Sequence, residues 1–170
     1  MSGQLAIRAV ALRENFDRGF AAPRQAGAQD VVDFLAISVD ASPYAIRLAD
    51  IASLSTDHVI TAIPGQAGVL GLAGFRGAML PVYALAALLG HDTAAPARWL
   101  VRAPPVAFAF PRFEGHLRLP AAQVVANAQE APAPRHVRGF LEHETHIRPI
   151  LDMASLFEAV RILAGATKRE

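Results

Sequence analysis

The sequence repeats one short pattern at a fixed spacing of 68 residues (139 − 71 = 68). Four residues of the first copy recur unchanged in the second copy: Gly71, Pro81, Ala86 and Leu88, then Gly139, Pro149, Ala154 and Leu156. Apolar positions keep the same spacing, for example Met79 and Ile147. A repeat of this length predicts two similar structural units that pack together. The boundary between two such units is a natural place for binding.

The composition favours a folded protein without a nucleic-acid partner. The 170 residues are 53% hydrophobic and 18% charged, which is sufficient for a core and too apolar for a disordered chain. The net charge of +1 gives no electrostatic reason to bind nucleic acid. Cysteine is absent, which excludes disulfides and thiolate chemistry and fits a reducing compartment. We therefore expect a cytoplasmic protein.

Alternation of apolar and polar residues predicts many short strands. The expected strands are 31–39, 44–48, 59–63, 69–75, 79–83, 99–102, 106–110, 117–125, 137–141 and 147–151. Short helices are expected over 84–89 and 155–163, after each repeat, and a longer one over 4–18, before a linker at 20–30. Evenly spaced short strands favour small barrels or sandwiches.

No segment predicts insertion into a membrane. Arg8 and Arg13 interrupt the N-terminus, so we expect no secretory signal. The most apolar window lies between Asp57 and Asp92 but contains Pro64, Pro81 and several glycines. A membrane helix needs about 20 consecutive apolar residues, so this window is interpreted as buried sheet.

Few residues suggest catalysis, a metal or a cofactor. There is no nucleophile elbow, no phosphate-binding glycine loop and no pair of convergent carboxylates. His143, Glu144 and His146 resemble a zinc motif, but their spacing is too short for one helix face and they lie in a predicted turn. We expect no catalytic residue, metal or cofactor. A small metal-dependent hydrolase using these three residues is the alternative from a different class.

Arg76 is an isolated cation in an apolar stretch, next to Gly77. One interpretation is that it simply solvates the tip of a hairpin, because a charge is costly unless it reaches water or a partner. The other is that an arginine surrounded by exposed apolar residues forms a binding hot spot. The residues alone leave both open.

The segment over residues 64–85 resembles the CheW-like family of chemotaxis coupling proteins. It reads Pro-x-x-x-x-Val-Leu-Gly-Leu-x-Gly-Phe-Arg-Gly-x-x-Leu-Pro-Val-Tyr-x-Leu. The hairpin expected over 34–51 and the strands expected over 137–156 resemble the opening and closing parts of that family. The similarity extends over about residues 30–157.

The resemblance implies a mainly β fold of two packed five-stranded Src-homology-3-like barrels, with an N-terminal helix and short helices after each repeat. Residues 1–30 would be the helix and linker, and 31–165 the CheW-like domain, with barrels at about 31–92 and 98–157. It further implies a non-enzymatic adaptor that joins the cytoplasmic tip of a chemoreceptor to the regulatory domain of a CheA-type histidine kinase. Such a protein would be cytoplasmic and recruited to membrane-bound receptor arrays.

The resemblance also implies a binding site for the receptor. The residues that would line or support the receptor side are Val69, Gly71, Phe75, Arg76 and Gly77. Some segments depart from the family pattern: 106–111 lacks polar alternation, and 117–120 reads Leu-Arg-Leu-Pro. These departures favour, as an alternative, an accessory member that binds the receptor but binds the kinase weakly or not at all.

Overall fold

The computed structural model describes residues 30–63, 68–92, 96–126, 134–143 and 146–166. From Val31 on, they belong to one compact unit. The helix expected over 4–18 and nearly all of the expected linker lie outside the described residues. Among the described residues, no helix is long and apolar enough to cross a membrane.

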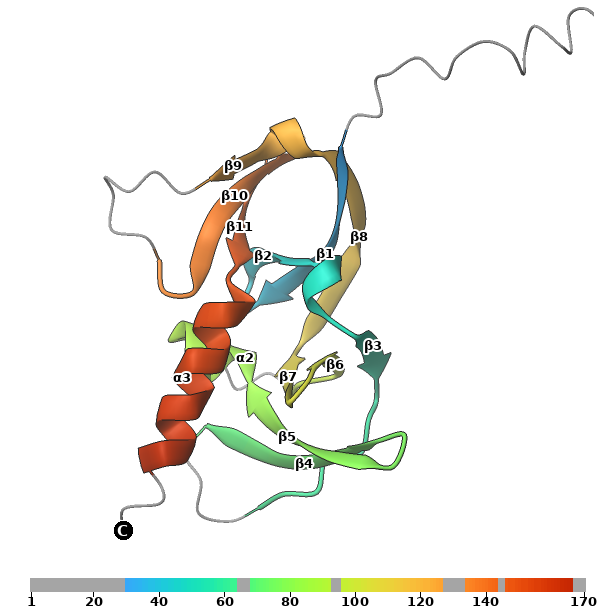
Figure 1. Cartoon of the computed structure of the whole chain (residues 1–170), viewed down its shortest axis with the longest axis vertical. Helices are drawn as coiled ribbons and strands as arrows, with labels where there is room; N and C mark the ends of the chain where they lie inside the picture. The colour runs from blue at the N-terminus through green and yellow to red at the C-terminus, as the bar shows by residue number, and fades with distance from the viewer. Residues whose placement is uncertain (1–29, 64–67, 93–95, 127–133, 144–145, 167–170) are drawn as a thin grey trace, which may run out of the picture. The chain divides into compact units, whose positions relative to one another are not determined.

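Two sheets, one of six strands and one of five, form this unit (Figure 1). The first sheet runs β8 (Arg112–Pro120), β1 (Val31–Val39), β2 (Ser42–Arg47), β11 (His146–Leu151), β10 (Val137–His143), β9 (Val124–Ala126). The second sheet runs β3 (Ser53–Thr56), β6 (Trp99–Ala103), β7 (Val106–Phe110), β5 (Ala78–Ala84), β4 (Val69–Phe75). The helical segments are η1 (Leu48–Asp50), α2 (Leu85–Leu89), η2 (Ala121–Gln123) and α3 (Met153–Ala166). The mainly β fold with a helix after each repeat is confirmed.

The two repeats exchange their first hairpins. Strands β1 and β2 of the first repeat pair with β8 and β11 of the second, while β6 and β7 of the second repeat pair with β3 and β5 of the first. The expected barrels at 31–92 and 98–157 therefore do not coincide with the two sheets, each of which draws strands from both repeats. The sequence marks the repeated unit, but two similar hairpins carry no signal for which unit each one joins.

Three apolar clusters hold the unit together. One lies inside the first sheet around Phe34 and Ile150, and a second lies inside the second sheet around Val82 and Leu100. The third and largest joins both sheets to α2 and α3, with α3 contributing Leu156. Strands β1 and β7 alternate their side chains between a sheet interior and this shared cluster. Strand β7 lacks polar alternation because both of its faces are buried.

Two sequence predictions are wrong for identifiable reasons. Residues 59–63 form no strand; Thr61 makes only an isolated bridge to Leu72. The gap between the expected strands at 106–110 and 117–125 predicts a turn containing Glu114 and Gly115, but both residues lie inside β8, where the register with β1 shifts by one residue. The glycine there marks a β-bulge rather than a chain reversal.

Candidate partner-binding site

The β4–β5 hairpin ends in a two-residue turn made of Arg76 and Gly77. Phe75 pairs with Ala78, and the two turn residues have positive φ angles of 45° and 86°. Positive φ at both positions is the signature of the type I′ turn, which matches the twist of the flanking strands. The turn leaves Arg76 exposed, and within the described part of the chain its guanidinium has no ion-pair partner.

Phe75, the residue before the turn, is buried and packs inside the second sheet. Its side chain is 8% exposed and belongs to the cluster inside the second sheet. The ring of His58 stacks on it with centroids 4.5 Å apart, and His58 Nε2 donates a 2.7 Å hydrogen bond to the carbonyl oxygen of Gly74. This arrangement fixes the strand just before the turn.

Val69 and Gly71 lie at the other end of β4, away from the turn. Val69 is partly buried against the shared cluster, and Gly71 is buried with a φ of 151°. A Cβ atom on Gly71 would overlap the carbonyl oxygen of Thr61. Gly139, its counterpart, has the same role, since a Cβ there would lie 2.6 Å from Val125 O. The structure thus brings Phe75, Arg76 and Gly77 together and places Val69 and Gly71 elsewhere.

Two exposed apolar residues close to the turn were not predicted. Met79, opposite Gly74 in the hairpin, is 58% exposed, and Val59, next to His58, is 81% exposed. We name Arg76, Gly77 and Met79 the tip surface. The available sequence signal was that Met79 follows the predicted turn at Arg76-Gly77 by two residues; its counterpart Ile147 is likewise exposed beside the tip of a hairpin. Val59 gave no such signal, since its segment resembled a buried strand.

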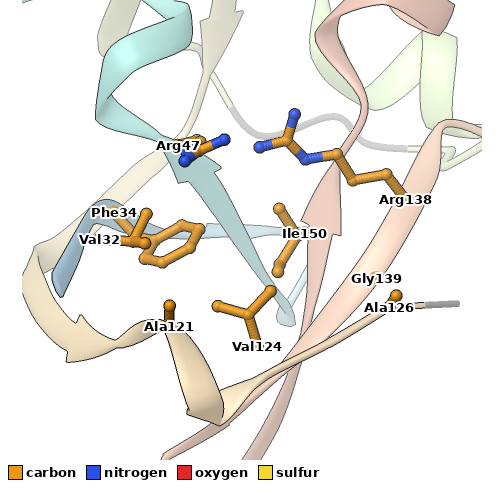
Figure 2. Close-up of a pocket in the computed structure, with 9 residues that line it drawn as sticks. All are labelled: Val32, Phe34, Arg47, Ala121, Val124, Ala126, Arg138, Gly139 and Ile150. Atoms are coloured by element: carbon orange, nitrogen blue, oxygen red, sulfur yellow. The ribbon is translucent and has the colours of Figure 1, made fainter. Parts of the chain in front are cut away.

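A separate cavity opens at one end of the first sheet (Figure 2). Its volume is about 300 Å³. The lining residues are Val32, Phe34, Arg47, Ala121, Val124, Ala126, Arg138, Gly139 and Ile150. Arg47 and Arg138 extend toward each other over an apolar floor. This cavity was not predicted, because its two arginines belong to different repeats.

Among the described titratable groups, burial is the largest cause of the pKa shifts of Tyr44, Tyr83 and His136. Burial raises the pKa of Tyr44, whose hydroxyl lies 2.7 Å from His91 Nε2. Burial and the charge of Arg135 lower the pKa of His136, and Asp152 partly opposes this. The described residues contain no cluster of three or more potential metal ligands. Glu144, part of the alternative metal motif, lies outside them.

The two sheets, which share strands from both repeats, define a small β protein with an exposed hairpin turn at Arg76. A family model for the CheW-like domain matches residues 33–161, and the chain belongs to the CheW-like family. Proteins of this family are non-enzymatic adaptors of chemotaxis signalling, and the chain has that general role.

One solved structure supports the fold assignment. It is that of the scaffolding protein TtCheW from Thermoanaerobacter tengcongensis, with a TM-score of 0.62 and 14% sequence identity. The match covers 71% of this chain and 88% of that one. At this identity the similarity establishes the fold, including its two Src-homology-3-like barrels. No curated protein sequence matches the chain.

Proposed function

We propose that this protein couples chemoreceptors to a CheA-type histidine kinase, and that the tip surface contacts the cytoplasmic tip of the receptor. The observation that carries this proposal is the conformation of Arg76. A tight turn holds it exposed at positive φ, beside the exposed side chain of Met79. Residues 31–165 would act as the coupling domain, working in the cytoplasm at receptor arrays, with residues 1–30 as an N-terminal extension.

Binding is a physical reason to retain arginine in this turn. A side chain at positive φ costs about 1–2 kcal/mol, and asparagine, aspartate or glycine would fit the turn better. Backbone strain of this kind is concentrated at functional sites. An arginine beside exposed apolar groups is also the typical composition of a hot spot. The tip surface is small, so a weak single contact would gain strength from many contacts in an array.

The second repeat offers a separate surface for the kinase. Ile147 on β11 is 63% exposed and Val125 on β9 is 45% exposed. Both lie in the first sheet, whereas the turn at Arg76 belongs to the second sheet. The receptor would then bind to the second sheet and the kinase to the first sheet, so the protein could bind both at the same time.

Charge reversal at the turn tests the receptor contact. Arg76→Glu and Met79→Glu should each reduce co-sedimentation with receptor-containing membranes by about tenfold, while the melting temperature stays near that of the wild type. Arg112→Glu is the matched control, because Arg112 is an exposed arginine at the start of β8 in the other sheet. Unchanged recruitment of a folded Arg76→Glu variant would remove the tip surface from the receptor site.

Ile147→Glu tests the kinase contact separately. We expect this variant to co-sediment with receptor membranes but to recruit less CheA-type kinase to them. If the wild-type protein itself binds receptor membranes and recruits no kinase, the accessory role is correct and the coupling role is wrong.

A further inference from the structure

The cavity at the end of the first sheet has an apolar floor made by residues of both repeats. Phe34 and Ile150 are each 1% exposed and form its base, and Val32 and Val124 form partly buried walls. Figure 2 shows these side chains converging from β1, β9 and β11 on the same space. Ligand pockets are typically apolar and range upward from about 300 Å³, so the cavity is large enough for a small molecule.

The charged residues that line the cavity are both arginines, Arg47 and Arg138. Arg47 pairs in register with Phe34, so its side chain lies on the interior face of β2. Its Nε atom is buried and has no hydrogen-bond partner within the described ranges of the chain. Arg138 lies 3.3 Å from Asp50, and these two residues line a neighbouring hollow together with Asp152, outside the cavity itself.

Asp33 lines a separate hollow with Arg47, but the ion pairs of its carboxylate are with other residues. Asp33, which precedes Phe34, has its carboxylate 2.9 Å from His116 and 3.9 Å from Arg118. A buried donor without a partner is costly, and two facing cations repel each other. A bound anion would relieve both costs, because a carboxylate can accept hydrogen bonds from two guanidinium groups.

We propose that this cavity is a binding site for a small apolar carboxylate, of the size of a medium-chain acyl or aryl acid. The carboxylate would lie between Arg47 and Arg138, and the hydrocarbon part would occupy the space above Phe34 and Ile150. The site is distinct from the tip surface: Arg47 and Arg138 belong to the first sheet, and Arg76 to the second. The proposal goes beyond the adaptor role and does not depend on it.

Titration of the full-length protein with sodium octanoate tests the site. We expect saturable binding by calorimetry, and chemical-shift changes in the methyl groups of Val32, Val124 and Ile150. Octanol supplies the same chain length without the charge and should bind at least about tenfold more weakly. This comparison uses only the wild-type protein, so it holds even if a variant fails to fold.

Arg47→Met provides the matching change in the protein and should weaken octanoate binding about tenfold, which corresponds to about 1.4 kcal/mol. The control is Arg98→Met, since Arg98 is an exposed arginine that pairs with Asp57 and lies outside the cavity. Absence of saturable octanoate binding would overturn the proposal. Equal binding of octanol, or equal binding by a folded Arg47→Met variant, would also overturn it.

Discussion

Replacing Gly71 with alanine should destabilise the second sheet by an amount that the structure allows us to work out. The new Cβ would overlap the carbonyl oxygen of Thr61, so the strand segments must separate. Two 2.8 Å hydrogen bonds between Thr61 and Leu72 would then be lost, at about 1 kcal/mol each. Alanine at a φ of 151° adds about 1 kcal/mol of strain. The total is about 3 kcal/mol.

For a domain of this size, such a loss lowers the melting temperature by about 6–12 °C. The assay is thermal and urea unfolding followed by circular dichroism. Gly74→Ala is the matched control on the same strand, because a Cβ there would lie 3.5 Å from the flexible Met79 Sδ in ordinary contact. We expect this control to melt at or slightly above the wild-type temperature. Equal melting temperatures for the two variants would refute the argument from close strand approach.

Three further predictions concern the rest of the fold. Gly139→Ala should destabilise the first sheet in the same way, by about 2 kcal/mol in urea unfolding, because its Cβ would lie 2.6 Å from Val125 O. Glu114→Gln should lower the free energy of unfolding by about 1–3 kcal/mol, since it removes the negative charge 2.6 Å from the largely buried Arg148. A double-mutant cycle with Arg148→Met would show no coupling if the pair is unimportant. The pKa of His136 is lower in the folded protein than its usual 6.5, so the unfolded chain takes up the proton first and stability should fall as the pH drops through 6.5. His136→Asn, which suits the φ of 60°, should reduce this slope, and an unchanged slope would contradict the assignment.

The sequence predicts local structure well where one physical signal dominates. Strand β1 is placed residue for residue, because its apolar run and the turn after it are unambiguous. The β4–β5 hairpin and α2 are also confirmed, since Arg76-Gly77 marks the turn and Gly90 ends the helix in the left-handed conformation. These elements depend on neighbours in the chain.

The features that were missed depend on distant contacts. The exchange of hairpins is decided by pairing between segments tens of residues apart, such as Val82 with Ala107. The cavity needs Arg47 and Arg138 to meet from different repeats. Met79 is the exception, because its exposure has a local cause, its place beside the turn, whereas its apolar character suggested a core position. The partner-binding role of the five motif residues stays a prediction.

Because β1–β2 and β6–β7 each pair with strands of the other repeat, this chain does not consist of two domains in series. A break in the connection between α2 and β6 would leave each fragment with a sheet that lacks its central strands. Neither half could then fold without the other, so the whole unit should unfold in a single cooperative step. A single ancestral repeat would have lacked the same central strands, and it could have obtained them by exchanging its hairpin with that of a second copy. The present fold thus has the topology of an intertwined dimer joined into one polypeptide.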